Sequence, residues 1–187
     1  MQKKDVLFIT QAAAIAALYV VLTAVAAGFD LASGMIQVRF SEALCVLPFF
    51  TAAAVPGVTI GCLIANIVTG CMLPDVIFGT LATAIGAIAS WYLRKNRILV
   101  AIPPIVSNAI IIPLVLTYAY KIPGGIPLQM LTVGAGEVIS CMIFGQIILS
   151  ALYPFRQYMF GNEYDNTVPV HDKDEKNEQV SKTDSDV

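Results

Sequence analysis

The sequence has 187 residues, of which 57% are hydrophobic and 13% charged, and its mean hydropathy is +0.76. Soluble globular domains are about 25% charged, so this composition excludes an ordinary soluble domain and indicates an integral membrane protein. The formal net charge of −2 averages two unlike regions. Residues 1–160 carry eight Lys/Arg and five Asp/Glu, whereas residues 161–187 carry three Lys and eight Asp/Glu.

Six apolar segments follow one another along the first region, and a helix needs about twenty such residues to cross a bilayer. The first segment begins like a signal peptide, but its apolar stretch is too long for one, so we predict a spanning helix. The second and third are short, and Pro56-Gly57 between them predicts a tight turn. They form either two short spans or a re-entrant pair. We therefore predict an all-α membrane protein with a six-transmembrane-helix bundle, formed by residues 6–28, 41–55, 57–73, 75–93, 98–120 and 128–154.

The final segment, residues 161–187, is polar and acidic and lacks apolar periodicity, which predicts a disordered tail. The expected organisation is a transmembrane substrate-binding domain over residues 1–160 followed by this acidic cytoplasmic tail. Four cysteines lie in apolar runs without metal-ligand or redox spacing. We expect them to be buried, reduced thiols; they are Cys45, Cys62, Cys71 and Cys141.

The placement of basic residues predicts the orientation of the helices. With the N-terminus in the cytoplasm, six Lys/Arg residues of the first region lie at cytoplasmic ends and two lie outside, as the positive-inside rule requires. An even number of spans then places both termini in the cytoplasm and the protein in the cell membrane. The cytoplasmic set is Lys3, Lys4, Arg94, Lys95, Arg97 and Arg156, and the outer set is Arg39 and Lys121.

Several functions have no support in the sequence. No GxxxxGK[ST] motif occurs, so we expect no ATP site of the Walker type in this chain. The sole histidine, His171, lies in the tail, which leaves no Ser-His dyad or histidine metal site in the membrane region. No basic patch with interleaved aromatic residues indicates nucleic-acid binding. We therefore predict a protein that is not an enzyme and uses no cofactor or metal.

Ionisable residues inside a membrane are costly and indicate a functional site. Arg39 and Glu42 enter the second segment from its outer side, and their i,i+3 spacing predicts one helical face. Asp75 opens the fourth segment at the outer surface. At 1.5 Å per residue, Asn66 lies about 10 Å and Glu137 about 14 Å below the outer ends of their segments. The polar residues thus predict a pocket open to the outside, and the candidate ligand-binding residues are Arg39, Glu42, Asn66, Asp75, Asn108 and Glu137.

Simpler structural roles compete with ligand binding at these positions. Arg39 could be an interfacial residue paired with Glu42 across one turn, and Asp75 could be an N-cap after Pro74. The two asparagines could form interhelical hydrogen bonds, and we expect the deeper Gln146 to be structural. Such roles explain Glu137 least well, because no Lys or Arg in its own segment lies near it.

Small residues in the first segment predict a close helix–helix contact. Four-residue spacing relates Ala12 to Ala16 and Ala13 to Ala17, and such faces let helices approach closely. The contact could be with a partner protein or internal to the bundle, or the pattern could reflect the abundance of alanine in this segment.

Three stretches, "IQVRFSEALCVLPFF", "GVTIGCLIANIVTG" and "PDVIFGTLAT", resemble the QueT family of queuosine-precursor transporters. These are the substrate-binding (S) components of energy-coupling factor (ECF) transporters, and the resemblance covers about residues 6–155. It implies a six-helix bundle with a pocket on its outer side, a transmembrane coupling subunit and two ATPase subunits. The alanine spacing resembles the contact that S components make with the coupling subunit, here through Ala12/Ala16 or Ala13/Ala17.

The ligand that the resemblance implies is a 7-deazaguanine such as queuine or 7-aminomethyl-7-deazaguanine. One of Glu42 and Glu137 would accept from its guanine-like edge, and the other would meet an aminomethyl cation. Asn66 or Asn108 would serve the carbonyl and ring nitrogens, while Arg39 would orient Glu42 until the ligand arrives. An ion-coupled carrier that uses Glu137 as its protonation site, or an S component for another vitamin-like substrate, remains an alternative.

Overall fold

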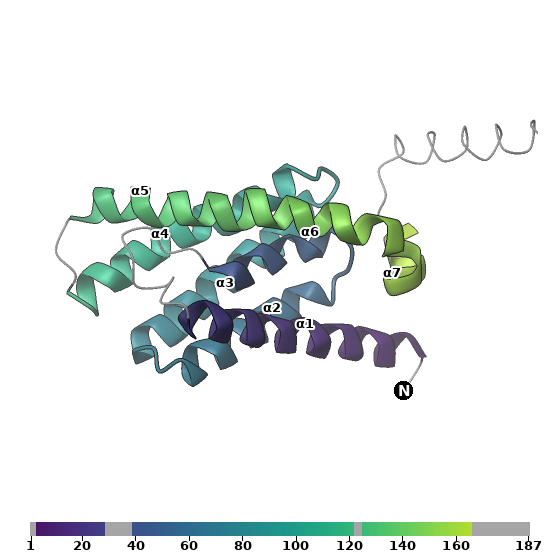
Figure 1. Ribbon diagram of the computed structural model, residues 1–187, viewed down its shortest axis with the longest axis horizontal. Coiled ribbons are helices and arrows are strands. Elements are labelled where there is room, and N and C mark those ends of the chain that lie inside the picture. Colours follow the sequence, from purple (N-terminus) through teal and green to yellow (C-terminus); the bar gives the residue numbers. More distant parts are fainter. Residues whose placement is uncertain (1–2, 29–38, 122–124, 166–187) are drawn as a thin grey trace, which may run out of the picture.

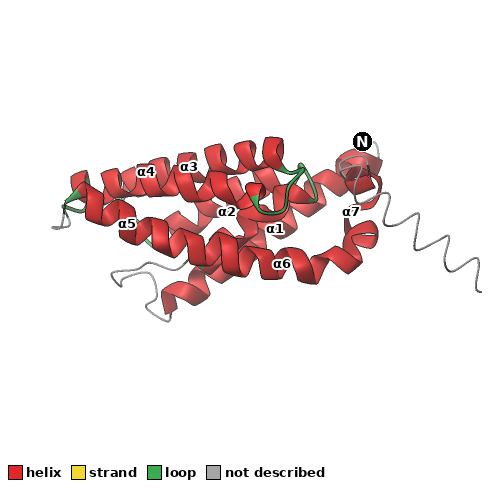
Figure 2. Ribbon diagram, turned by 90° about the horizontal axis from the view of Figure 1, so that it is seen from above, coloured by secondary structure: helices red, strands yellow, loops and turns green. Residues whose placement is uncertain are grey.

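The computed structural model describes residues 3–28, 39–121 and 125–165, and these residues are helical apart from short turns (Figure 2). This confirms the predicted all-α class. The long helices lie roughly along one direction (Figure 1). In chain order the elements are α1 (Lys3–Gly28), η1 (Phe40–Phe49), α2 (Ala54–Val68), α3 (Leu73–Leu93), η2 (Leu99–Ala101), α4 (Ile102–Tyr118), α5 (Ile126–Glu137), η3 (Val138–Phe144), α6 (Gly145–Leu152), η4 (Tyr153–Phe155) and α7 (Arg156–Asp165).

Four helical stretches among the described residues are long and apolar enough to cross a membrane: Lys4–Gly28, Leu73–Leu93, Leu99–Tyr118 and Ile126–Phe160. The last of these joins α5, η3 and α6 without a break. The predicted second and third segments are shorter helices, η1 with 10 residues and α2 with 15. At 2.0 and 1.5 Å per residue these measure about 20 and 22 Å, less than the ~30 Å of hydrocarbon. Six complete crossings therefore stay a prediction.

The short 3₁₀ element η1 lies at the centre of the bundle. Residues 41–49 are all buried, and η1 contacts α1, α2, α3, α6 and η3. Pro48 has no N–H to donate to an α-helical bond, and the Glu42 N–H donates to the Arg39 carbonyl at i−3. The prediction of one helix over residues 41–55 is corrected, because η1 ends at Phe49 and a turn follows over residues 50–53.

The predicted turn at Pro56-Gly57 is wrong, because both residues lie in the first turn of α2. Proline is tolerated there, since the first N–H groups of a helix have no intrahelical partner. The glycine serves close packing: a Cβ on Gly57 would lie 2.9 Å from the Ala12 carbonyl oxygen. One turn later, a Cβ on Gly61 would lie 2.7 Å from the Cβ of Tyr19. Helices α1 and α2 are therefore in backbone contact.

This contact separates the two alanine pairs of α1. Ala16 is 8% exposed and lies against Gly61, and Ala12 lies against Gly57 on the same face. Ala13 and Ala17 are exposed. The first pair thus packs inside the bundle, and the second is available to a partner.

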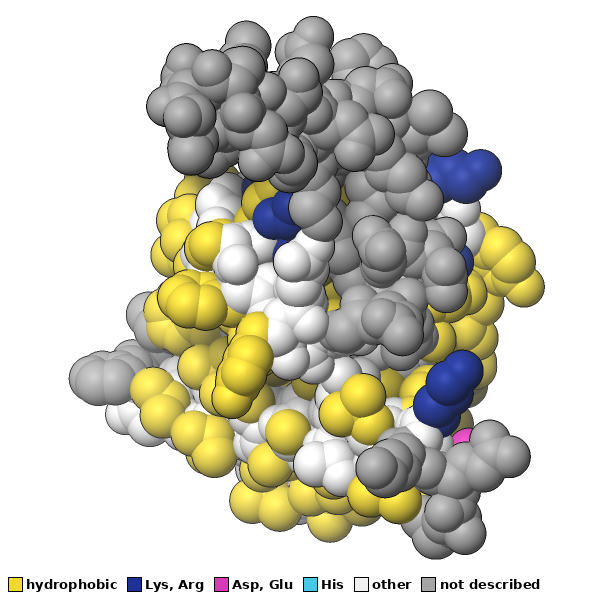
Figure 3. Space-filling view, turned by 90° about the vertical axis from the view of Figure 1, so that its right-hand side faces the viewer, with side chains coloured by type: hydrophobic (Ala, Val, Ile, Leu, Met, Phe, Trp, Pro, Cys, Tyr) yellow, Lys and Arg dark blue, Asp and Glu magenta, His cyan; other side chains and the backbone are white. Residues whose placement is uncertain are grey.

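The two ends of the bundle differ in what they carry. The start of α1 and all of α7 lie at the right of Figure 1, and the end of α4 and the start of α5 lie at the left. Seen from the right (Figure 3), several Lys and Arg side chains are visible. At this end the ring of Phe160 stacks on Phe50 with centroids 5.0 Å apart. Helix α7 continues over residues 161–165, where the acidic tail was expected to begin, and residues 166–187 lie outside the described part of the chain.

Candidate functional site

The six candidate residues come from the chain before η1 and from five helices, and five of the six are buried. Glu42 is 1% exposed, Asn108 2%, Asn66 3%, Asp75 5% and Glu137 5%, whereas the Arg39 side chain is 21% exposed. Several of the six candidate residues also contact Tyr19, Cys45, Cys62 or Cys141. We refer to these ten residues as the carboxylate cluster.

Glu42 is held on η1 by two neutral donors. The Tyr19 hydroxyl of α1 donates to Oε1 at 2.5 Å, and the Cys45 thiol donates to Oε2 at 3.1 Å. An ionised carboxylate is costly to bury unless it is hydrogen-bonded, and these two donors meet part of that requirement. Neither carries a positive charge.

Glu137 ends α5, and its described donors are also neutral. The Asn108 amide of α4 donates to the carboxylate, and the Cys141 thiol donates to Oε2 at 3.7 Å. The same sulfur lies 3.4 Å from the backbone oxygen of Glu42. Cys141 belongs to the π-helical stretch η3, which starts directly after Glu137, and such stretches are frequent at functional sites. One thiol thus contacts both glutamates, Glu137 through its carboxylate and Glu42 through its backbone oxygen.

Asn66 joins the cluster through Cys62. Its amide donates to the Cys62 sulfur at 3.5 Å, and the Thr83 hydroxyl of α3 donates to the same sulfur at 3.3 Å. Cys62 in turn hydrogen-bonds the Tyr19 side chain. A chain of contacts therefore runs from Asn66 through Tyr19 to Glu42.

Asp75 and Asn66 both lie against Gly79, which has no side chain to displace them. A Cβ on Gly79 would lie 3.2 Å from the Asn66 amide nitrogen and 3.4 Å from Asp75 Oδ1. On its other side Asp75 Oδ2 lies 4.0 Å from the Arg39 guanidinium and accepts from the Tyr120 hydroxyl at 3.3 Å. Asp75 therefore ties α3 to the start of η1 and to the end of α4.

These contacts correct two predictions. Arg39 was expected to share a helical face with Glu42 and to neutralise it, but Arg39 precedes η1 in extended conformation (φ −103°, ψ 103°) and pairs with Asp75. Asp75 was considered as an N-cap, but α3 begins at Leu73 after the N-cap Met72, so Asp75 lies within the first turn. A carboxylate there is favoured by the helix dipole.

The sequence did not predict Tyr19 or the thiols as parts of the site. Cys45, Cys62 and Cys141 are buried and free, as expected, whereas Cys71 is only half-buried. Two of them did carry a signal, because Cys45 follows Glu42 by three residues and Cys141 follows Glu137 by four, and residues so spaced are neighbours on a helix. A signal did exist for Tyr19, since a buried tyrosine hydroxyl needs a hydrogen-bond partner.

Gln146 and Gly134 lie on the same long helical stretch as Glu137. The Gln146 amide donates to the backbone oxygen of Arg97 at 2.6 Å, which agrees with its predicted structural role. Gly134 has no tight neighbour. A Cβ there would meet only the Ala109 side chain, at an ordinary 3.6 Å.

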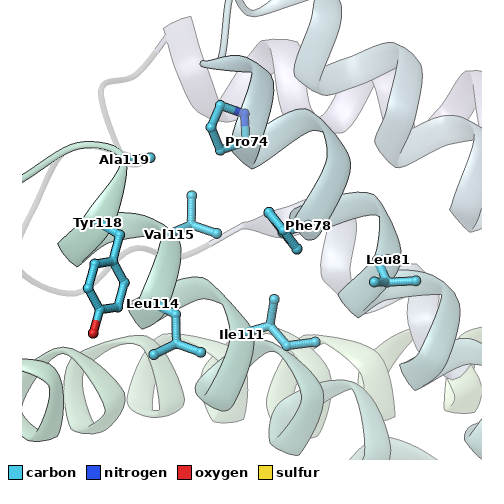
Figure 4. A pocket seen from close by; sticks show the side chains of 8 residues that line it. All are labelled: Pro74, Phe78, Leu81, Ile111, Leu114, Val115, Tyr118 and Ala119. Carbon is cyan, nitrogen blue, oxygen red and sulfur yellow. The ribbon is translucent and has the colours of Figure 1, made fainter.

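Two apolar cavities lie away from the carboxylate cluster. One, of about 590 Å³, lies between α3 and α4 (Figure 4). The other, of about 480 Å³, lies between α1, η1, α6 and α7. The α3–α4 cavity offers almost no polar group for a purine-like edge. None of the six candidate residues lines either cavity; the α3–α4 cavity is lined by Pro74, Phe78, Leu81, Ile111, Leu114, Val115, Tyr118 and Ala119.

The cluster offers carboxylate and amide groups to a ligand. Within the described ranges, no three His, Cys, Asp or Glu side chains are arranged to hold a metal ion. Because Glu42 and Glu137 are at most 5% exposed, a ligand reaches them only when covering atoms move aside. The arrangement suits a small polar molecule that donates hydrogen bonds.

A sequence model of the QueT transporter family matches residues 9–154. The chain belongs to the QueT transporter family. The matched range contains all six candidate residues and excludes the acidic segment. Searches of curated proteins and of solved structures gave no match. Membership assigns the chain to membrane transport and agrees with the prediction that it is not an enzyme.

Proposed function

We propose that this QueT protein is the substrate-binding subunit of an ATP-driven ECF importer for a queuosine precursor, either queuine or a related 7-deazaguanine. The observation that carries the proposal is the pair of buried glutamates, Glu42 and Glu137, both in contact with Cys141, Glu137 through its carboxylate and Glu42 through its backbone oxygen. Their described donors are all neutral. Two carboxylates in such surroundings gain from a ligand that brings several donors or a positive charge.

A 7-deazaguanine has these properties. Its N1–H and exocyclic amine point the same way, and a carboxylate accepts two parallel hydrogen bonds from such an edge. An aminomethyl substituent adds a cation for the second carboxylate. Asn108 already lies at Glu137, and its amide can hydrogen-bond the carbonyl of the base. Asn66, Asp75 and Arg39 extend the polar surface beyond Glu42.

The proposal includes a transmembrane coupling subunit and two ATPases, which would supply the energy. The exposed pair Ala13 and Ala17 is the part of α1 that can admit a partner helix closely. Ala17→Leu is expected to abolish uptake by the assembled transporter and to leave ligand affinity within about twofold. Ala151→Leu, the same change at an exposed alanine of α6, is the control. If Ala17→Leu lowers affinity in parallel with uptake, the alanine face belongs to the internal packing.

We also propose that both termini face the cytoplasm, which places the carboxylate cluster toward the outside. The support is the six-to-two division of Lys and Arg between the two sides. Reporter enzymes fused to either terminus test this orientation. A fusion that is active only outside the cell would contradict it.

The binding proposal is tested with the purified full chain. Thermal-shift and calorimetric titrations would compare queuine, 7-aminomethyl-7-deazaguanine and 7-cyano-7-deazaguanine with guanine and a set of vitamins. Saturable binding that is confined to deazaguanines supports the proposal. Binding of a vitamin alone would identify that vitamin, rather than a deazaguanine, as the substrate. Uptake into liposomes by this chain without partners, driven by a pH gradient, would instead identify an ion-coupled carrier.

A further inference from the structure

Tyr19 is a buried tyrosine whose hydroxyl reaches across from α1 to a carboxylate on η1. The residue is 2% exposed, and its O–H···Oε1 distance to Glu42 is 2.5 Å. Hydroxyl–carboxylate hydrogen bonds of 2.5–2.7 Å are charge-assisted and roughly twice as strong as neutral ones. Tyr19 therefore makes a strong contact to Glu42 and restricts its side chain.

The position of the Tyr19 ring is itself restricted by α2. Gly61 of α2 faces the Cβ of Tyr19. Only a glycine fits at position 61, because a Cβ there would lie 2.7 Å from the Tyr19 Cβ. The Cys62 side chain, next to this glycine, hydrogen-bonds Tyr19. Helix α2 thus restricts the Tyr19 side chain, and the Tyr19 hydroxyl in turn hydrogen-bonds Glu42.

The two donors of Glu42 leave room for a ligand. A carboxylate accepts about four hydrogen bonds, two at each oxygen. Tyr19 uses one acceptor site on Oε1, and Cys45 uses one on Oε2. Among the described residues these are its side-chain donors, so one site on each oxygen is left, which is the pattern that a bidentate donor edge needs.

We propose that Tyr19 is a positioning residue that orients Glu42 to accept two hydrogen bonds from the ligand edge. The inference rests on the proposed function, because it assigns Glu42 to the deazaguanine. A free glutamate side chain loses rotamer entropy when a ligand orders it. Orientation of the side chain before binding removes that cost from the affinity.

A double-mutant cycle with 7-aminomethyl-7-deazaguanine tests this role. Tyr19→Phe keeps the buried ring and removes the donor, and we expect about tenfold weaker binding, equivalent to about 1.4 kcal/mol. In a Glu42→Gln background the same change should cost less than about twofold, because the orientation of the carboxylate is already lost. If Glu42→Gln removes measurable binding, Glu42→Asp replaces it, since it shortens the side chain and withdraws the carboxylate from Tyr19.

Thr23→Val is the matched control on α1. It removes a hydroxyl that lies 2.9 Å from both the Tyr19 backbone oxygen and the Ser41 hydroxyl and bonds no carboxylate, and affinity should stay within about twofold. Wild-type affinity in Tyr19→Phe, or an equal loss in both backgrounds, would overturn the positioning role and leave the proposed function intact. A wild-type protein that binds no deazaguanine would overturn the proposed function and this inference together.

Discussion

At the end of the bundle that holds the start of α1 and α7, polar side chains bond mostly to backbone groups, with Thr51–Gln11 and Arg97–Ser150 as exceptions, whereas in the carboxylate cluster they bond mostly to other side chains. Gln146 donates to the Arg97 carbonyl, Gln11 to that of Met159, and Ser90 to that of Val100. In the cluster, by contrast, the partners of Glu42, Asn66 and Asp75 are tyrosines, thiols and a guanidinium. Tyr19 and Cys45 contact Glu42, Cys62 contacts Asn66, and Arg39 and Tyr120 contact Asp75.

The difference separates structural polar groups from those available to a ligand. Most side-chain hydrogen bonds in proteins go to backbone or water, and only about 10–15% of all hydrogen bonds join two side chains. In a bond to the backbone of a packed helix only the side-chain partner can rotate, because the helix fixes the carbonyl. A bond between two side chains can be exchanged by rotation, so the cluster can trade its internal partners for those of a ligand.

The largest expected effect comes from Glu137→Gln, which replaces an acceptor oxygen with a donor amide. We expect ligand binding to weaken by about 2–4 kcal/mol, because a charge-assisted bond is lost and a buried group is left unsatisfied. This is about thirty- to several-hundred-fold in affinity, measured by calorimetry on protein shown to be folded. Gln146→Ala is the control from the other end, expected to lower the melting temperature and leave affinity unchanged. Wild-type affinity in a folded Glu137→Gln variant would remove this residue from the site.

Phe160→Ala tests the end of the bundle that holds α7, where side chains are expected to stabilise the fold rather than to bind the ligand. Phe160 is 5% exposed and stacks on Phe50. Its truncation should cost about 3 kcal/mol of stability, at the lower end of the range for buried Phe→Ala changes. Thermal unfolding in detergent measures the loss. A marked loss of ligand affinity in folded protein would show that the two ends are not functionally distinct.

Gly61→Ala tests the contact that holds Tyr19 in place. The added Cβ would lie 2.7 Å from the Tyr19 Cβ, and such overpacking costs about 1–3 kcal/mol. Gly134→Ala, where the new Cβ meets only a methyl group at 3.6 Å, should change stability little. Both melting temperatures are compared with the wild type. Equal effects of the two changes would contradict the close α1–α2 packing.

The smallest effect is expected from Arg39→Gln. Its ion pair with Asp75 is long, at 4.0 Å, and the Arg39 side chain is 21% exposed. Because the pair is long and Asp75 keeps the Tyr120 hydroxyl as a donor, the melting temperature of ligand-free protein should change only slightly. A loss as large as that of Phe160→Ala would show that the pair is a main support of the cluster.

The sequence predicted the membrane class and the ranges of the longer helices well, because long apolar runs have few alternatives. It failed for η1, since a protein core and a lipid bilayer select the same apolar residues. The Pro56-Gly57 turn was wrong for a related reason: proline marks both turns and first turns of helices. The burial of Glu42 and Glu137 could be predicted from their neighbours in sequence. The Tyr19–Glu42 bond could not, because it joins residues 23 positions apart and depends on tertiary packing, whereas the i,i+4 spacing of Glu137 and Cys141 was a local signal that went unused.

The central claim, that the carboxylate cluster binds the ligand, is tested most directly by an experimental structure of the full chain with 7-aminomethyl-7-deazaguanine. We expect the guanine-like edge within about 3 Å of the carboxylate oxygens of Glu42 or Glu137, the usual distance for an N–H···O bond. The other glutamate should face the aminomethyl group. A ligand seated in the α3–α4 cavity, with both glutamates keeping their present partners, would contradict the claim.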